Sequence, residues 1–152
     1  MDATSLDPDR LDVLYVEDEP LNVMLMDALF QRRPDLRLSV AIDGTEALDI
    51  APTLQPCVLL LDLNLPDCYG VALLHHLRTM PGYASVPAVA VTSDYGFRVG
   101  DTGFIEVWNK PLHVAHVLAR LDALVAAYRS GRMAAQRGAD SRVTEDRRAA
   151  AY

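Results

Sequence analysis

Residues 57–62 read CVLLLD, an unbroken apolar run that ends in an aspartate. A short run in which every position is apolar is typical of a parallel strand whose two faces are both covered by helices. Asp62 therefore closes a central strand, and the segment after it, which contains Pro66, must be a loop. Such a strand indicates an α/β fold, with its neighbouring strands formed by similar short runs elsewhere in the chain.

Shorter apolar segments on either side of this strand alternate with stretches of helical pattern. The other predicted strands are residues 11–16, 36–41, 86–91 and 104–108. The predicted helices are residues 20–33, 45–54, 70–80 and 111–129. Strands that alternate with helices predict a parallel sheet with helices on both faces.

The composition sets the broad class of protein. The 152 residues fit one domain, residues 11–129, after a lead-in (1–10) and before a basic Ala/Arg-rich tail (130–152) that is either disordered or an extension of the last helix. A net charge of −7 argues against nucleic acid as a partner. Because no apolar run approaches the ~20 residues of a membrane span, and no signal peptide is present, we expect a cytoplasmic protein without a membrane partner.

Polar residues follow four of the predicted strands. Glu17, Asp18 and Asp62 are carboxylates, Thr92 is a hydroxyl, and Lys110 is the only lysine of the chain. In an open parallel sheet, ligands bind at the carboxyl ends of the strands. Clustered carboxylates attract Mg²⁺, one carboxylate can act as a nucleophile toward phosphorus, and an ammonium binds phosphate as a point charge.

Each of these residues also has a plainer explanation. Three acids at 17–19 are common at a solvated helix start. Asp62 and Thr92 can simply end strands in turns, and a lone lysine is usually a surface residue. Their order at successive strand ends is what favours a shared site.

Four segments together resemble the bacterial response-regulator receiver family, and in particular receivers attached to hybrid histidine kinases. The segments are LYVEDEPLN (14–22), LLLDLNLPDCYG (59–70), AVAVTSD (88–94) and NKPL (109–112). The resemblance covers about residues 11–128. It implies a flavodoxin-like, doubly wound fold with five parallel strands in the order 2-1-3-4-5.

The resemblance also implies a role for each polar residue. Asp62 is expected to be the phosphoacceptor, and Mg²⁺ is expected to bind to Glu17, Asp18, Asp62 and the backbone carbonyl of Asn64. By the same resemblance Thr92 is the switch hydroxyl and Lys110 is the lysine that contacts the phosphoryl group.

The chain departs from the family pattern between Thr92 and Lys110. The 18-position spacing looks shorter than usual by about one turn. Gly96, Gly100 and Gly103 lie in this segment, and a glycine costs about 1 kcal/mol in a helix interior. We therefore expect the fourth helix to be short or absent.

The resemblance implies a signalling module. The only catalytic activity expected of it is, at most, Mg²⁺-dependent self-phosphorylation and self-dephosphorylation. It receives a phosphoryl group from a histidine kinase or phosphotransfer protein and signals to an unidentified downstream protein. Only 23 residues follow Arg129, so no output domain is expected.

Other functions remain to be weighed. An aspartyl phosphohydrolase of the haloacid-dehalogenase type would need Asp-x-Asp, but here Asp62 is followed by Leu63 and Asn64. A receiver-like interaction domain that works unphosphorylated has no need of the acids and Lys110. A nucleotide-binding flavodoxin relative is disfavoured because neither GxGxxG nor a P-loop is present.

The first predicted helix, PLNVMLMDALF (20–30), is apolar almost all round. A helix packed on a sheet needs an apolar stripe of only about 100°. If Leu21, Leu25, Ala28 and Leu29 form that stripe, the remaining apolar residues are either covered by neighbours or form a docking patch. In the receiver family this helix docks on the bundle that carries the phosphohistidine, so whichever of Met24 and Met26 is exposed is expected to contact the phosphodonor.

Overall fold

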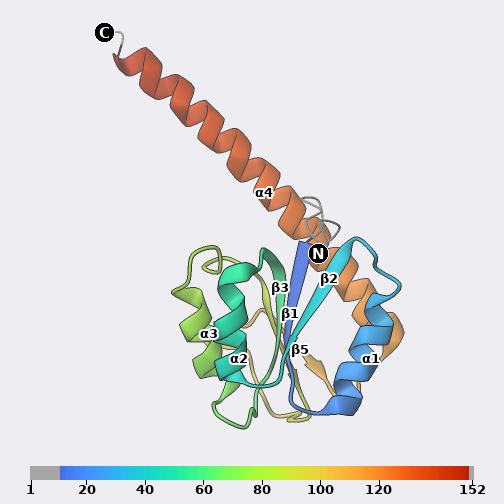
Figure 1. The fold of residues 1–152 in the computed structure, drawn as a ribbon. Helices are drawn as coiled ribbons and strands as arrows, with labels where there is room; N and C mark the ends of the chain where they lie inside the picture. Colours follow the sequence, from blue (N-terminus) through green and yellow to red (C-terminus); the bar gives the residue numbers. More distant parts are fainter. Residues whose placement is uncertain (1–10, 151–152) are drawn as a thin grey trace.

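The computed structural model describes residues 11–150, and its centre is a five-stranded parallel sheet (Figure 1). The strand order is β2-β1-β3-β4-β5, as predicted. The strands are β1 (Leu11–Val16), β2 (Leu36–Ala41), β3 (Pro56–Asp62), β4 (Ala88–Thr92) and β5 (Glu106–Asn109). The predicted lead-in, residues 1–10, lies outside the described residues.

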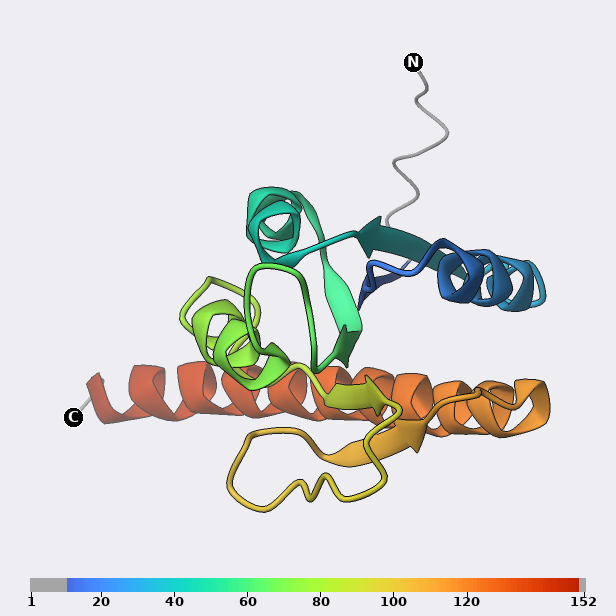
Figure 2. The ribbon, with the colours of Figure 1, turned by 90° about the horizontal axis from the view of Figure 1, so that it is seen from below.

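Helices cover both faces of the sheet (Figures 1 and 2). They are α1 (Pro20–Phe30), α2 (Gly44–Ile50), α3 (Gly70–Arg78) and α4 (Val114–Ala150), with a 3₁₀ turn at Ala51–Thr53. The helices α2 and α3 lie on one face, and α1 and the first part of α4 lie on the other.

The central strand β3 explains why its sequence has no alternation. Every residue of β3 is buried. Val58 and Leu60 belong to the core under α1 and α4, whereas Leu59 and Leu61 belong to the core under α2 and α3. Since successive side chains of a strand point to opposite faces, a strand covered on both sides needs apolar residues at every position.

Local signals fix the two helix starts nearest the carboxyl edge of the sheet. Pro20 occupies the first turn of α1, where its missing N–H costs nothing, and the Glu19 side chain accepts the N–H of Leu21. Asp43 caps α2 by accepting the N–H of Glu46 at 2.8 Å. The acids at residues 17–19 therefore lie directly between the end of β1 and a well-defined helix start.

The prediction of a short or absent fourth helix is wrong. The structure has four α-helices within residues 11–150, and the fourth, α4, spans 37 residues. The prediction looked for this helix in the glycine-containing segment 93–103, which forms turns and bends, with positive φ at Gly100 and Gly103. The fourth helix of the structure is the one predicted at residues 111–129. It begins at Val114, and a buried stripe of apolar residues anchors it: Val117, Leu121, Leu124 and Val125.

Helix α4 continues to Ala150 and projects away from the sheet (Figure 1). It therefore crosses residue 130, where the sequence suggests a boundary, and the division into domain and tail stays a prediction. Among the described residues, no helix combines the length and the apolar character that crossing a membrane requires.

The buried side of α1 differs from the stripe considered from the sequence. Met26, Leu29 and Phe30 are buried, whereas Leu21 and Leu25 are exposed. Met24 is 67% exposed and Met26 is fully buried, so Met24 is the methionine available at the surface.

Candidate functional site

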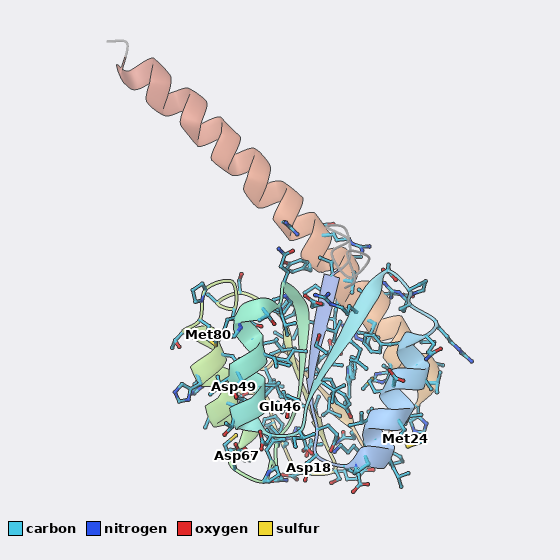
Figure 3. The ribbon with its side chains drawn as sticks, in the orientation of Figure 1. Asp18, Met24, Glu46, Asp49, Asp67 and Met80 are labelled. Atoms are coloured by element: carbon cyan, nitrogen blue, oxygen red, sulfur yellow. The ribbon has the colours of Figure 1, made fainter. Side chains whose placement is uncertain are left out.

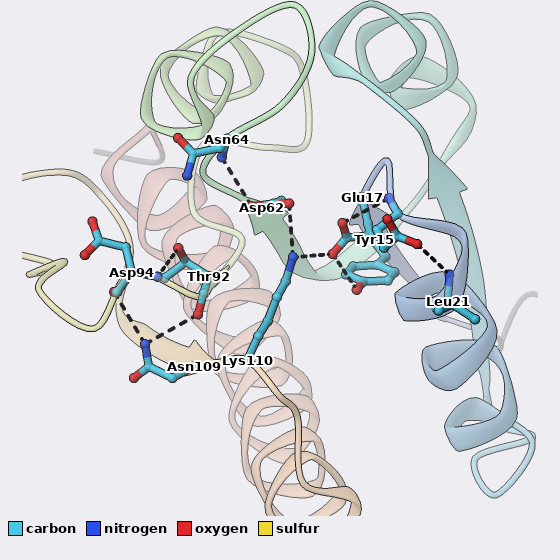
Figure 4. A network of polar contacts seen from close by, with 10 residues as sticks. Tyr15, Glu17, Leu21, Asp62, Asn64, Thr92, Asp94, Asn109 and Lys110 are labelled. Carbon is cyan, nitrogen blue, oxygen red and sulfur yellow. Dashed lines mark hydrogen bonds and ion pairs between the residues drawn. The ribbon is translucent and has the colours of Figure 1, made fainter.

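The carboxyl edge of the sheet brings together polar residues from four adjacent strands (Figure 4). Glu17 follows β1, Asp62 ends β3, Thr92 ends β4, and Lys110 follows β5. Because all strands are parallel and β1, β3, β4 and β5 are neighbours in this order, their ends lie side by side. The parallel pairing of the strands therefore brings Glu17 and Lys110 to the same edge of the sheet, although they are 93 positions apart in the sequence.

The ammonium of Lys110 bridges two buried carboxylates. Its Nζ lies 2.7 Å from Oε1 of Glu17 and 3.1 Å from Oδ2 of Asp62. The Lys110 side chain is only 17% exposed, so both ion pairs are shielded from water. One positive charge thus faces two negative charges.

Burial and the excess of negative charge shift the pKa values of Asp62 and Lys110. Burial and then the charge of Glu17 raise the pKa of Asp62, although Lys110 acts in the opposite direction. Burial alone would lower the pKa of Lys110, but the hydrogen bonds and charges of Glu17 and Asp62 outweigh it, so this pKa is raised. The lysine therefore stays charged, and the site still favours additional positive charge.

A third carboxylate makes the cluster suitable for a hard cation. Glu17, Asp18 and Asp62 each offer a carboxylate oxygen, and these oxygens lie within 4.8 Å of one another. Asp18 is exposed, so the cluster opens to solvent on one side. Mg²⁺ prefers one or two carboxylates together with water, and this donor set fits it.

Two further predicted residues flank the cluster. The N–H of Asn64 donates to Oδ1 of Asp62 at 3.2 Å, which fixes the start of the β3–α3 loop beside the carboxylate. Thr92 is buried, and its Oγ1 accepts the N–H of Asp94 at 3.0 Å. The carbonyl of Thr92 accepts the N–H of Lys110 at 2.8 Å, so the end of β4 is tied to the residue that carries the ammonium.

The structure also identifies positions that the sequence prediction missed. Gly70 packs under the phosphoacceptor candidate: a Cβ there would lie 2.8 Å from Cα of Leu63 and closer still to the carbonyl oxygen of Asp62. Only glycine allows this close approach. A glycine at the first position of a predicted helix, directly after the loop that follows Asp62, was a usable signal.

Asp67 ties the β3–α3 loop to α2. Its carboxylate accepts the N–H of Gly44 at 2.8 Å, the N–H of Thr45 at 2.9 Å and the hydroxyl of Thr45 at 2.8 Å. These bonds, the one from Gly44 first, lower the pKa of Asp67 to about 2. Nothing in the local sequence signals this contact, because the partners lie more than 20 positions away.

The pH dependence of stability should report this contact. The stabilisation is complete above the unfolded pKa of about 4 and is lost as the pH falls toward the folded pKa of about 2. Asp67→Asn should therefore unfold at a lower urea concentration than wild type at pH 7, and the difference should shrink between about pH 4 and pH 2. Asp49→Asn, at an exposed aspartate of α2 (Figure 3), is the control and should show no such convergence. If the loss of stability in Asp67→Asn stayed constant down to about pH 2, the ionised Asp67 carboxylate would not be the source of the stabilisation.

Comparisons with known proteins agree with this fold. Residues 13–122 match the family model of the response regulator receiver domain. Protein Rrf1 of Nitratidesulfovibrio vulgaris is 29% identical over 119 residues, which cover 78% of this chain and 86% of Rrf1. The transcriptional activator protein PfeR of Pseudomonas aeruginosa is 33% identical over 135 residues, which are 88% of this chain but 44% of PfeR. The chain thus spans less than half the length of this second relative.

A solved structure shows the same fold. The receiver domain of a sensor histidine kinase from Pseudomonas aeruginosa PAO1 superposes with a TM-score of 0.68 at 23% identity, covering 77% of this chain and 98% of that one. That structure was determined with a magnesium ion coordinated in its active-site cleft.

Proposed function

The chain belongs to the response regulator receiver domain family, and on that premise we propose that it accepts a phosphoryl group on Asp62 and passes a signal to another protein. The observation that carries this proposal is the Lys110 bridge, because it places a fixed positive charge 3.1 Å from one oxygen of Asp62. Asp62 retains 7% exposure while Glu17 has none, so Asp62 is the carboxylate of the bridged pair that a donor can reach.

The proposed reaction is a phosphoryl transfer to a carboxylate. An oxygen of Asp62 attacks phosphorus, the P–N bond to the imidazole of a phosphohistidine breaks, and the leaving imidazole nitrogen takes up a proton. Hydrolysis reverses the modification: water attacks phosphorus and restores the carboxylate and inorganic phosphate. The chain returns to its starting state, so the modification works as a switch.

Glu17, Asp18, Asp62 and the backbone carbonyl of Asn64 are the groups proposed to hold Mg²⁺. When bound, this ion supplies the positive charge that offsets the phosphoryl oxygens among the carboxylates. The three carboxylates with oxygens within 4.8 Å support this assignment.

Lys110 and Thr92 are proposed to respond to the phosphoryl group. Lys110 exchanges its contact with Asp62 for a phosphoryl oxygen, since an ammonium binds phosphate as a point charge. The Thr92 hydroxyl, which now accepts from Asp94, turns to donate to another oxygen. Thr92 and Asp94 lie at the start of the β4–β5 connection. The rotation of the Thr92 hydroxyl would therefore displace this connection, and the displacement would be the signal.

Labelling with a small phosphodonor tests the proposed function. Incubated with acetyl phosphate and Mg²⁺, the chain should gain one phosphoryl group, as measured by intact mass. Chelation of the cation with EDTA should abolish the gain. Labelling that is unaffected by EDTA, or no labelling at all, would refute the proposal. Continued turnover of an aryl phosphate far beyond one equivalent would favour the phosphohydrolase instead.

The phosphodonor is proposed to be a histidine kinase or a histidine phosphotransfer protein that docks on α1. Three apolar side chains are exposed near the start of this helix, namely Leu21, Met24 and Leu25. Met24 lies at the same edge of the molecule as Asp18 (Figure 3). An apolar patch beside the acidic site supports a docking role, and methionine adapts readily to a partner helix.

Substitution of Met24 separates docking from chemistry. Met24→Lys should slow transfer about tenfold from a kinase identified by phosphotransfer profiling, because a lysine cannot enter an apolar contact. Labelling by acetyl phosphate should stay unchanged. Ile105→Lys is the matched control, since Ile105 is also exposed but precedes β5, at the opposite edge of the sheet. Docking on α1 is wrong if Met24→Lys leaves transfer from the kinase unchanged.

A further inference from the structure

We propose that Tyr15 is a positioning residue of the site, whose buried hydroxyl holds the Glu17 carboxylate in the orientation that binds Mg²⁺. The hydroxyl keeps Glu17 in this orientation after Lys110 has moved from Glu17 to the phosphoryl group. This inference rests on the proposed function for the roles of Glu17 and Lys110. Its observations are independent of that function.

Tyr15 and Glu17 lie two positions apart at the end of β1, so their side chains are on the same side of the strand. The hydroxyl of Tyr15 donates to Oε1 of Glu17 at 3.1 Å (Figure 4). Both residues have no exposed surface. Because neither residue is exposed, bulk water does not compete with the phenol for the Glu17 carboxylate.

Glu17 receives three contacts from donors, and they differ in how permanent they are. Oε2 accepts the backbone N–H of Glu19 at 3.2 Å. Oε1 is shared by Tyr15 and by the ammonium of Lys110 at 2.7 Å. Tyr15 and Glu19 belong to the same segment as Glu17. Lys110 follows β5, which β3 and β4 separate from β1, and its ammonium also contacts Asp62.

This division gives Tyr15 a specific task. When Lys110 moves to a phosphoryl oxygen, Oε1 of Glu17 loses its charged partner. The Tyr15 hydroxyl then remains as the donor to this oxygen, so a buried carboxylate keeps both its orientation and its hydrogen bond. A phenylalanine at position 15 would leave Oε1 dependent on Lys110 and would make the lysine costly to move.

The role of the hydroxyl is separate from that of the ring. The Tyr15 ring packs in the core under α1 and α4. Tyr15→Phe retains this ring and removes only the donor. Tyr83→Phe is a matched control, because Tyr83 is equally buried and its hydroxyl donates to the carbonyl of Ala51 at 2.7 Å, in the other core.

Titration with Mg²⁺ alone, followed by backbone amide NMR shifts, tests the proposal without any phosphodonor. Tyr15→Phe should raise the Kd for Mg²⁺ about tenfold, the usual cost of removing a group that orients a metal ligand. Tyr83→Phe should leave the Kd within about twofold of wild type, although both variants lower Tm. In a Glu17→Gln background, Tyr15→Phe should cause no further loss of affinity.

Four binding results would overturn the proposal: an unchanged Kd in Tyr15→Phe, equal losses in both tyrosine variants, additive effects with Glu17→Gln, or a wild-type chain that binds no Mg²⁺. A Tyr15→Phe chain that fails to fold would also overturn it, since the hydroxyl would then support the fold. If the wild type binds Mg²⁺ but is never labelled on Asp62, the proposed function fails while the measured affinity ratios still decide the role of Tyr15.

Discussion

Asp62→Asn should accept no phosphoryl group from acetyl phosphate, even at saturating Mg²⁺. Asparagine nearly preserves the shape of the side chain and can keep the contact with the Asn64 N–H, so the fold should survive. Its neutral amide is not a competent nucleophile toward phosphorus, whereas the carboxylate is. The expected effect is a loss of labelling to the background, the largest that we predict.

Two measurements make this prediction specific. Asp49→Asn removes an exposed carboxylate from α2 and should be labelled as fast as wild type. Circular dichroism should show that Asp62→Asn is folded. If a folded Asp62→Asn chain gained a phosphoryl group at the wild-type rate, the acceptor would be another residue.

Lys110→Arg should slow labelling about a hundredfold, the usual cost of removing one well-placed electrostatic contact to a transition state. The Lys110 ammonium fits between Glu17 and Asp62 with donor–acceptor distances of 2.7 and 3.1 Å. A guanidinium is wider and planar, and its fork suits one carboxylate in a bidentate pair better than a point contact between two. Conserving the charge should therefore not conserve the function.

The comparison for Lys110→Arg is the reverse exchange at another ion pair. Arg120 of α4 forms hydrogen bonds to both carboxylate oxygens of Glu106, at 2.7 and 2.9 Å. Arg120→Lys should leave the labelling rate unchanged because this pair lies on the α4–β5 contact and not among the acids. A Lys110→Arg chain that is labelled at the wild-type rate would show that Lys110 is not the phosphate contact.

The centre of the sheet was predictable from the sequence because β1, β3 and β4 are buried at every position. The strand order follows from the family resemblance, and β1 and β2 match their predicted bounds. The predicted strand 86–91 is observed as Ala88–Thr92, so that Thr92 belongs to the strand rather than following it. The predicted helix from Pro20 to residue 33 ends at Phe30, and its last turn carries no basic residue or other sequence signal that would have marked this end.

The remaining features depend on contacts between distant parts of the chain. Helix α1 is apolar on nearly every side, so no periodicity indicated that Met26 is buried and Met24 exposed. The bonds that Asp67 accepts from α2 join residues more than 20 positions apart. Tyr15 and Glu17 are only two positions apart, but the burial of their bond depends on the elements packed around β1. The short or absent fourth helix was expected in segment 93–103, following the family's order of helices, whereas the fourth helix of the structure is the one that the apolar stripe from Val114 predicted at residues 111–129.

Identification of the modified residue tests most directly whether Asp62 is the phosphoacceptor. The chain is labelled with acetyl phosphate and Mg²⁺ and reduced with borohydride, which converts an aspartyl phosphate to homoserine, and its peptides are sequenced by tandem mass spectrometry. A single conversion is expected, at Asp62. Conversion at Glu17, at Asp18 or at any other carboxylate instead of Asp62 would contradict this assignment.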